Sequence, residues 1–318
     1  MEALREGDRR ALARAITLVE DGAPLAAEVV GDLYPSTGRA YSVGLTGPPG
    51  VGKSSLIAAL IGVVRAEERT VGVISVDPSS PFTRGALLGD RIRLADHFLD
   101  PGVFIRSMGT RGHAGGLAEA TLQALLILDA AGKDVVFLET VGTGQSEVGV
   151  ISIADTVVLV LQPGSGDAVQ ALKAGIMEIP DVIAINKRDH PLARSALTEV
   201  RQVLALGPKD GWVPPIVLTE ATRDEGADEL WAAIAGHRAW LETEGELEVR
   251  RRRNLATEVF ALASARARRT IEDAVRDDPQ LAQLLDDVEE RRLDPLAAVR
   301  AILEQVFHLG DDDRTHTR

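Results

Sequence analysis

The nine residues GPPGVGKSS constrain this chain more than any other stretch of it. They follow the apolar run YSVGLT and lead into the helical pattern LIAALIGVV, so the spacing G-x-x-x-x-G-K-S lies between a predicted strand and a predicted helix. In this context the glycines let backbone N–H groups turn toward phosphates, Lys53 can neutralise phosphate oxygens, and the hydroxyl of Ser54 can bind Mg²⁺. A chance glycine turn is the alternative, and the flanking strand and helix argue against it. We expect the nucleotide to contact Gly47, Pro48, Pro49, Gly50, Val51, Gly52, Lys53, Ser54 and Ser55.

Short apolar runs alternate with helical patterns from Tyr41 onward. Runs that are apolar throughout are typical of a parallel sheet covered on both faces, with right-handed crossovers between its strands. The pattern predicts an α/β fold, a doubly wound and mostly parallel sheet forming a P-loop domain over residues 41–242. The runs are YSVGLT, VGVISV, VVFLE, VVLVL, VIAI and PIVL.

Helical patterns flank this domain on both sides. Residues 1–40 form a predicted N-terminal extension, with Asp8 as the N-cap of a helix and Gly22 just past its end. Residues 243–310 are predicted as a C-terminal helical arm whose last helix begins after Asp294, and residues 311–318 as a disordered tail. An appendage of this size usually packs on its own domain or on a second copy of the chain. The four arginines from Arg250 to Arg253 are interpreted as a solvated helix face.

Charge and composition exclude several classes of partner. The net charge is -13, which argues against a nucleic acid or an anionic membrane as the main partner. The chain has no cysteine, which excludes disulfides and thiolate metal sites and suits a reducing compartment. The start of the chain lacks an apolar signal core, and no apolar run approaches the ~18 residues of a membrane span. We therefore expect a soluble cytoplasmic protein.

The motif NKRD, directly after VIAI, indicates which base is bound. The carboxylate of Asp189 can accept hydrogen bonds from N1–H and the exocyclic amine of guanine, whereas adenine offers no such pair of donors on that edge. The stem of Lys187 can lie over the base while Asn186 ties the loop down. Because an open α/β sheet binds its ligand at the carboxyl ends of its strands, this placement favours guanine over adenine, and hence GTP and GDP as ligands.

Three acidic residues are candidates for holding Mg²⁺ with Ser54. Glu139 ends the strand-like run VVFLE, where nucleotide hydrolases usually carry an Asp that holds the ion or its water. Asp77 closes VGVISVD, and Asp90 lies in LLGD. A helix cap or a solvated charge is the alternative for each carboxylate, and burial at the end of a strand favours function for Glu139.

The segment after Glu139 bears on the rate of hydrolysis. The backbone N–H of Gly142 can bind a γ-phosphate, so this segment should sense GTP against GDP. A Ras-like enzyme has a water-orienting glutamine directly after this glycine, but here the residue is Thr143 and the nearest glutamine is Gln145. We therefore expect intrinsic GTP hydrolysis to be slow. Either a partner corrects the geometry of the site, or Gln145 moves in when the loop rearranges. The predicted catalytic residues are Lys53, Asp90, Glu139 and Gln145.

At this point the chain resembles the methylmalonyl-CoA mutase-associated GTPases, a family once labelled arginine-transport kinases. The resemblance runs from about Gly7 to Leu241 and is carried by long loops as well as by the P-loop. The matching segments, in family order and spacing, are DPSSPFTRGALLGD, RSMGTRGHAGGLAEAT, ETVGTGQSEV, PGSGDAVQALKAGIMEI and NKRD.

The resemblance implies a G-protein chaperone that gates cofactor loading of an adenosylcobalamin-dependent acyl-CoA mutase and protects or reactivates that enzyme. It also implies that Asp77, Asp90 and Glu139 surround Mg²⁺ and that the C-terminal arm makes a homodimer. By the same resemblance, the loops 77–90, 139–148 and 164–173 are candidate switches.

Three positions depart from the family pattern. Arg84 replaces a usual glycine, and Ala168 replaces a common second aspartate. Glu220 replaces the serine of the guanine-side loop LTEAT, in which Ala221 can still donate its backbone N–H to guanine O6. Base recognition should therefore survive, with Glu220 and Ala221 at the nucleotide, while Arg84 could alter a switch or a partner surface.

Other functions compete with this one. A kinase of small molecules or proteins would need an acceptor pocket, for which the sequence offers no residues. A nickel-delivery GTPase would need soft or clustered ligands, and the chain has no Cys and no paired His. A purely structural role predicts that loss of Lys53 changes only stability. Arg106 and Arg111 could act as an arginine finger in cis, an interpretation we do not favour.

Overall fold

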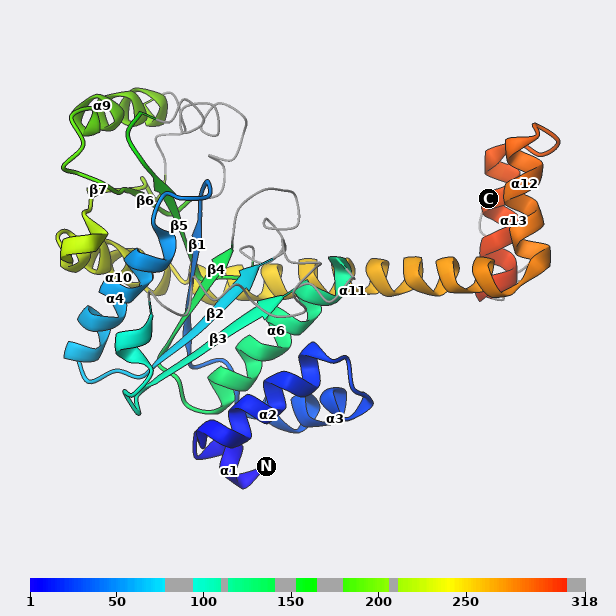
Figure 1. Ribbon diagram of the computed structural model, residues 1–318, viewed down its shortest axis with the longest axis horizontal. Helices are drawn as coiled ribbons and strands as arrows, with labels where there is room; N and C mark the ends of the chain where they lie inside the picture. Colours follow the sequence, from blue (N-terminus) through cyan, green and yellow to red (C-terminus); the bar gives the residue numbers. More distant parts are fainter. Residues whose placement is uncertain (78–93, 110–113, 141–152, 165–179, 206–210, 308–318) are drawn as a thin grey trace. The chain divides into compact units, whose positions relative to one another are not determined.

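A parallel sheet with the strand order β3-β2-β4-β1-β5-β6-β7 forms the centre of the fold (Figure 1). The computed structural model describes residues 1–77, 94–109, 114–140, 153–164, 180–205 and 211–307, without the side chains of residues 77 and 114–116. Within the described residues, each pair of neighbouring strands is parallel, as the uniformly apolar runs predict. The strands are β1 (Tyr41–Thr46), β2 (Val71–Asp77), β3 (Val103–Gly109), β4 (Val135–Thr140), β5 (Thr156–Leu161), β6 (Val182–Ile185) and β7 (Ile216–Leu218).

Strand β3 is absent from the strands predicted above. It lies at one edge of the sheet, and its middle residue Arg106 interrupts the apolar run. The guanidinium of Arg106 forms an ion pair with Glu20 and donates to the hydroxyl of Thr17, both on α2 (Arg9–Glu20). Because a helix covers the polar side chain there, the strand does not need to be apolar throughout. This pairing also engages the guanidinium that was considered as an arginine finger.

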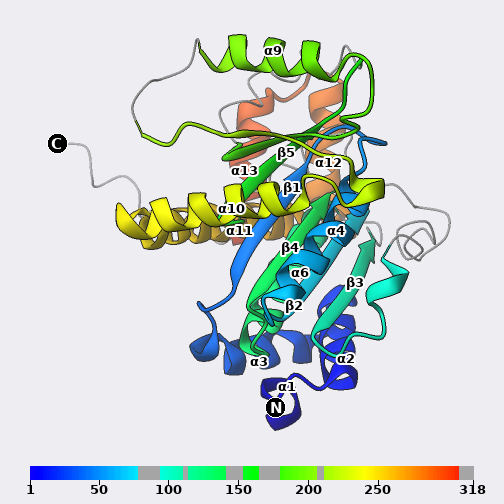
Figure 2. The same cartoon turned by 90° about the vertical axis from the view of Figure 1, so that its left-hand side faces the viewer.

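Helices cover both faces of the sheet (Figure 2). Helices α4 (Lys53–Ala66) and α10 (Ala227–Thr243) contribute to the apolar cluster that contains Val43, Phe137 and Val158. Alternate strand residues, such as Val136 and Leu159, face the opposite side, which is covered by α6 (Ala114–Ala130) and α9 (Ala193–Leu204). The predicted doubly wound α/β class is confirmed.

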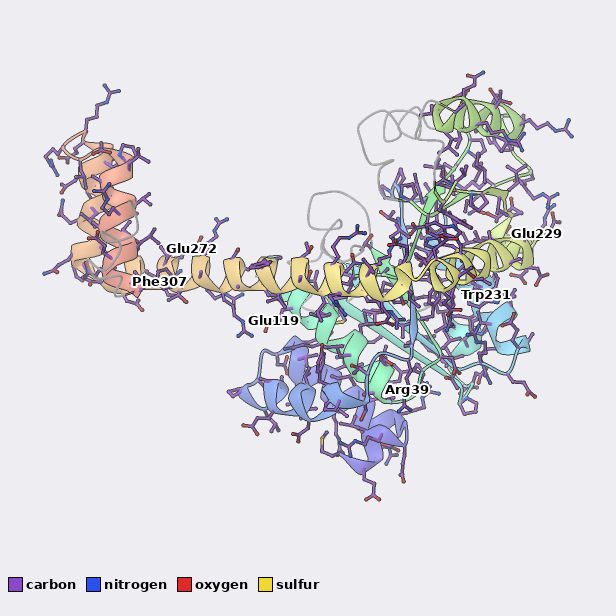
Figure 3. The ribbon with its side chains drawn as sticks, turned by 180° about the vertical axis from the view of Figure 1, so that it is seen from behind. Arg39, Glu119, Glu229, Trp231, Glu272 and Phe307 are labelled. Atoms are coloured by element: carbon purple, nitrogen blue, oxygen red, sulfur yellow. The ribbon has the colours of Figure 1, made fainter. Side chains whose placement is uncertain are left out.

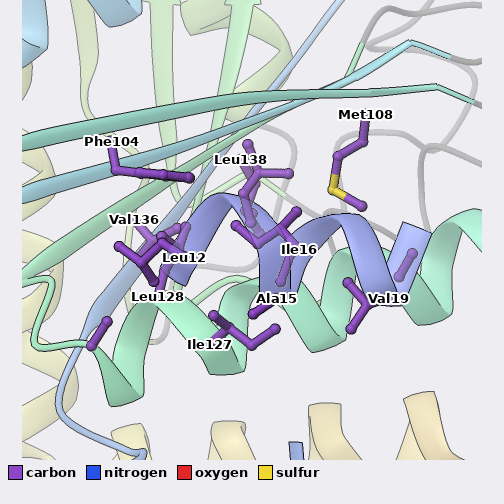
Figure 4. Packing of buried hydrophobic residues seen from close by; sticks show 14 of the residues in the cluster. Leu12, Ala15, Ile16, Val19, Phe104, Met108, Ile127, Leu128, Val136 and Leu138 are labelled. Atoms are coloured by element: carbon purple, nitrogen blue, oxygen red, sulfur yellow. The ribbon is translucent and has the colours of Figure 1, made fainter. Parts of the chain in front are cut away.

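The N-terminal helices pack on α6. Asp8 caps α2 by accepting the N–H of Ala11 at 2.8 Å, as the sequence predicted, and four residues of α2 at helical spacing are buried. Figure 4 shows Leu12 and Ile16 of this helix among Leu128 and Leu138. The predicted amphipathic helix is therefore one wall of a core shared with the sheet. The helices that precede and follow α2 are α1 (Glu2–Arg5) and α3 (Pro24–Leu33).

The chain divides into two compact units, Met1–Ala256 and Thr257–Arg318. Helix α11 (Glu246–Asp277) crosses this division. In the second unit, α12 (Pro279–Glu289) and α13 (Pro295–Phe307) pack together through buried Leu281, Ala298 and Ile302. Asp294 accepts the N–H groups of Leu296 and Ala297, each at 3.0 Å, so the predicted start of the last helix is confirmed. Short 3₁₀ turns lie at Tyr34–Ser36, Ala95–His97 and Ala221–Arg223.

Two of the four arginines in α11 are not solvated, which corrects the interpretation of that run. Arg251 forms a bidentate pair with Asp155, with N–O distances of 2.7 and 2.8 Å, and donates to the carbonyls of Gly38 and Ala40. Asp155 also accepts the backbone N–H of Ser42 at 2.9 Å. The charge pattern of a helix cannot reveal such pairing, because the carboxylate comes from a residue that directly precedes β5 and lies 96 residues earlier in the chain.

Arg250 belongs to a neighbouring polar network at the start of β6. Its guanidinium binds both oxygens of Asp181 at 2.9 and 2.7 Å. His237 is fully buried, with Nδ1 2.8 Å from the hydroxyl of Thr156 and Nε2 3.3 Å from Asp181 Oδ1, the latter within ion-pair distance but without hydrogen-bond geometry. Burial lowers the pKa of His237 to about 4, against the opposing effect of Asp181, so the imidazole is neutral near pH 7. Arg252 and Arg253 are exposed, as predicted.

Trp231, labelled in Figure 3, links α10 to the end of α4. The residue is 5% exposed, and its indole N–H donates to Glu67 at 2.8 Å. It is a packing residue. Within the described residues, no helix is both long and apolar enough to cross a membrane.

Candidate nucleotide-binding site

The P-loop connects β1 to α4 at the carboxyl edge of the sheet. Gly47 has φ 141°, and a Cβ there would lie 2.1 Å from the carbonyl oxygen of Val160. Gly52 has φ 97°, and a Cβ there would lie 2.4 Å from Nδ2 of Asn186. Both positions therefore require glycine, one for close approach to β5 and the other for contact with the NKRD motif. A cavity of about 270 Å³ opens beside this loop.

Lys53 begins α4 and is 5% exposed. Its ammonium donates to the carbonyl oxygens of Gly47 at 2.7 Å and Pro48 at 3.1 Å, both within the loop itself. The charge is thus held over the cavity mouth by acceptors weaker than a phosphate. Other P-loop residues that line the cavity are Pro49, Gly50, Gly52, Ser54 and Ser55, while Val51 is buried beneath them.

Ser54 and Glu139 meet at the bottom of the cavity. The hydroxyl of Ser54 donates to Oε1 of Glu139 at 2.6 Å, and the hydroxyl of Ser75 donates to Oε2 at 3.1 Å. Glu139 is 1% exposed at the end of β4, which is hydrogen-bonded to both β1 and β2. Hard cations such as Mg²⁺ prefer hydroxyl and carboxylate oxygens, so the donor set fits this ion.

Several predicted site residues lie outside the described residues. These are Asp90, Gly142 and Gln145, together with Arg84 and Ala168. The backbone of Asp77 ends β2 next to β4, but its side chain is not described. Among the described residues, no group of three or more His, Cys, Asp or Glu side chains is arranged to hold a metal ion.

Asn186 joins the two halves of the cavity. Its amide nitrogen donates to the carbonyl of Val51 at 2.8 Å, in the P-loop. Its amide oxygen accepts from the hydroxyl of Thr219 at 3.2 Å and from the backbone N–H of Ala221 at 3.1 Å, on the guanine-side loop. One buried side chain thus orders both loops, and the Ala221 N–H expected to bind a base carbonyl already has an acceptor.

Lys187 adopts a left-handed backbone conformation, with φ 61°. Such a conformation is uncommon for a residue with a side chain and is found at sites where the surrounding structure enforces it. Its ammonium donates to the carbonyl of Gly50 at 3.3 Å and to the side chain of Gln162. The carboxylate of Asp189 is exposed two residues later. The side chain of Lys187 therefore reaches from the NKRD motif to the P-loop.

In the guanine-side loop, the chain reverses direction between Glu220 and Glu225. Backbone hydrogen bonds link Glu220 and Glu225 in both directions, at 2.8 and 3.2 Å, and the side chain of Glu220 is buried against the cavity. Its Oε1 accepts from the hydroxyl of Thr222 at 2.6 Å. The structure thus places Asn186, Lys187, Glu220 and Ala221 at one end of the cavity that Lys53, Ser54 and Glu139 line at the other.

Three site residues escaped the analysis of motifs. Ser75 is a lone hydroxyl inside an apolar strand, Gln162 directly follows the apolar run of β5, and Thr219 directly follows β7. Each supports a predicted residue rather than facing the ligand by itself. A polar residue within or directly after a buried strand was the available signal.

The arrangement agrees with the comparison to known protein families. A family model described as "Methylmalonyl Co-A mutase-associated GTPase MeaB" matches residues 12–276. The chain belongs to the MeaB family of GTPases. The match includes the P-loop, the NKRD motif and most of α11, so the resemblance expected from the loop sequences is confirmed.

Individual relatives of this MeaB-family GTPase match it over most of its length. It is 48% identical over 314 residues to a protein of Pyrococcus abyssi whose GTPase assignment is provisional, covering 98% of this chain and 97% of that one. It is 35% identical over 271 residues to the Caenorhabditis elegans protein named "Methylmalonic aciduria type A homolog, mitochondrial", covering 79% and 68%. A crystal structure described as an LAO/AO transport system kinase superposes with a TM-score of 0.71 at 28% identity, over 96% of each chain.

Proposed function

We propose that this MeaB-family GTPase binds GTP and GDP with Mg²⁺ and hydrolyses GTP slowly as the timer of a chaperone. Its client in this proposal is an adenosylcobalamin-dependent acyl-CoA mutase, whose cofactor loading it gates and which it protects or reactivates. The proposal further assigns the chain to a homodimer formed through the C-terminal helices.

The hydrogen bonds of the Asn186 side chain support the nucleotide-binding part of this proposal. A side chain that hydrogen-bonds the P-loop and the guanine-side loop together makes phosphate binding and base binding parts of one event. The exposed carboxylate of Asp189 follows in the same motif and can accept the paired N–H donors of guanine. Adenine lacks that pair of donors and would leave the carboxylate of Asp189 without hydrogen-bond partners. The site therefore selects guanine by hydrogen bonding rather than by size.

Lys53, Ser54 and Glu139 provide the chemistry of the phosphate end. Lys53 exchanges loop carbonyls for phosphate oxygens, which neutralises charge where it develops during hydrolysis. Ser54 and Glu139 would hold Mg²⁺, which when bound offsets phosphate charge. The bond between the Ser54 hydroxyl and Glu139 orients both ligand oxygens before the ion arrives. Asp77 and Asp90 are proposed as further ligands, and Gln145 as the residue that orients water.

The family description supports the choice of client. The matching model is described as mutase-associated, and the relative from C. elegans is named for methylmalonic aciduria. A timer is useful to such a client because a GTP-bound and a GDP-bound state can bind the mutase with different affinities. Slow intrinsic hydrolysis, inferred from Thr143, would leave the partner in control of the interval.

The test measures phosphate release from GTP with and without methylmalonyl-CoA mutase from the same organism. We expect the mutase to accelerate release and to form a complex whose affinity depends on the bound nucleotide. A parallel assay with Lys53→Ala separates stimulation from contaminating activity. The absence of both stimulation and a nucleotide-dependent complex would exclude the chaperone role while leaving nucleotide binding intact.

A kinase is the second candidate, favoured by the name of the similar crystal structure. A kinase would transfer the γ-phosphate to an acceptor other than water, and most use ATP. Competition between ATP and fluorescent GDP decides between the two: stronger displacement by ATP than by GTP would favour the kinase. We expect GTP to displace the probe and ATP to fail.

A further inference from the structure

Glu220 presents an unusual group to the base end of the cavity. The residue is 5% exposed, and its Oε1 accepts from Thr222, but its Oε2 is buried without a hydrogen-bond partner. It lines the cavity together with Asn186, Lys187 and Ala221. Burying a carboxylate oxygen without a donor is unfavourable, so a ligand that supplies an N–H or O–H to this oxygen gains binding free energy.

The neighbouring protein donors are engaged elsewhere. The amide nitrogen of Asn186 donates to Val51, and the ammonium of Lys187 donates to Gly50 and Gln162. The backbone N–H of Ala221 donates to Asn186. A carboxylate can only accept, so a cavity occupant that satisfies Oε2 must bring a donor of its own.

We propose that Glu220 is a second base-reading carboxylate, whose Oε2 accepts an N–H of the 2-amino group of guanine. This inference rests on the proposed binding of guanine nucleotides. Guanine carries three N–H donors on its N1 and 2-amino groups, and a bidentate Asp189 takes two of them. Glu220 takes the third.

The consequence is a difference between guanine and hypoxanthine, which lacks the 2-amino group. Discrimination between the two bases then depends on two carboxylates instead of one. A hydrogen bond to a charged group contributes about 1.5–3 kcal/mol, which corresponds to roughly 10- to 100-fold in affinity.

The experiment measures GDP and IDP binding by titration calorimetry in the presence of Mg²⁺. Glu220→Met keeps the size of the side chain and removes both acceptors, and should weaken GDP binding about tenfold or more while changing IDP binding less than about twofold. Glu220→Gln keeps an acceptor oxygen and should recover part of the GDP affinity. This second variant also carries the test if the first does not fold, as judged by nucleotide-free melting.

Glu225 provides the matched control, because its exposed carboxylate lies on the same loop and pairs with Arg188 at 3.6 Å. Glu225→Met and Glu225→Gln should leave the ratio of GDP to IDP affinity unchanged. Equal losses for GDP and IDP in the Glu220 variants, no loss, or a gain in GDP affinity would each overturn the proposal. If the unaltered protein binds neither nucleotide, the proposed function fails instead, and the two failures are thereby distinguished.

Discussion

Polar residues flank strands β5 and β6 at both ends, but the contacts they make differ between the two ends. At the amino edge, Asp155 and Asp181 are paired with Arg251 and Arg250. At the carboxyl edge, the polar side chains hold loops around an open cavity, and Lys187 is among those that line it. At one edge of the sheet, charged side chains are therefore paired with each other. At the other edge, they line a cavity that can hold a ligand.

Cavity size alone would have placed the candidate site at the amino edge of the sheet instead of the carboxyl edge. A cavity of about 350 Å³ lies at the amino edge, larger than the one beside the P-loop, and Asp129 and Asp155 line it. Yet Asp129 accepts three backbone N–H groups, and Asp155 binds Arg251. The lesson is that a site is marked by polar groups whose partners are missing or exchangeable, because paired charges have little to gain from a ligand.

The largest expected effect is a loss of nucleotide binding at the carboxyl edge of the sheet. Lys53→Ala removes the cation that faces the phosphates, and we expect GDP affinity to fall by at least about 4 kcal/mol, roughly 1000-fold. Fluorescent GDP titration measures the loss. Arg252→Ala, which removes an exposed cation at the amino edge, is the control and should bind GDP normally. Equal affinity in Lys53→Ala and the unaltered protein would contradict the assigned phosphate site.

Asp155→Ala removes a buried ion pair at the amino edge of the sheet instead. It leaves Arg251 half-buried without its carboxylate and removes an acceptor for the backbone of Ser42, so the free energy of unfolding should fall by about 3 kcal/mol. Urea denaturation measures this loss. The exposed pair of Arg268 and Glu272 is the control, since solvent screens it and Glu272→Ala should leave the free energy of unfolding nearly unchanged. A similar cost for both variants would show that the buried pair has no special weight.

The pH dependence of stability sharpens the contrast further. The pKa of His237 is lowered to about 4 in the folded protein, against 6.5 when unfolded, so between these values the unfolded chain binds more protons. Stability from this group is therefore full above pH 6.5 and is lost as the pH falls toward 4, by roughly 2 to 3 kcal/mol. Denaturation at pH 7 and pH 4 of the unaltered protein and His237→Gln isolates this part. Parallel losses in the two proteins would refute it.

The smallest effect concerns the base end. Asp189→Asn replaces an acceptor-only group by an amide, and GDP affinity should fall about tenfold, or 1.4 kcal/mol. Because xanthine carries a carbonyl where guanine has its amine, the variant should bind XDP better than the unaltered protein does. Calorimetry with both nucleotides measures the exchange. A variant that loses both nucleotides equally would indicate a disturbed loop rather than altered base reading.

Local patterns determined much of this protein. The spacing of GPPGVGKSS predicts a loop that the structure places between β1 and α4, and six apolar runs predict strands that the sheet contains. The cap at Asp8 is likewise confirmed. These features follow from the sequence because their physical causes act over a few residues: strand burial, positive φ at glycine, and a side chain that accepts an N–H three residues ahead.

Tertiary structure alone decided how distant charges meet. Arg250 and Arg251 look like a solvated run until β6 and β5 bring Asp181 and Asp155 to them. Glu220 looks like a harmless departure until the fold buries its Oε2 beside the base end of the cavity. The reason is that a charge acquires its meaning from burial and from its partner, and both are supplied by chain segments far away in the sequence.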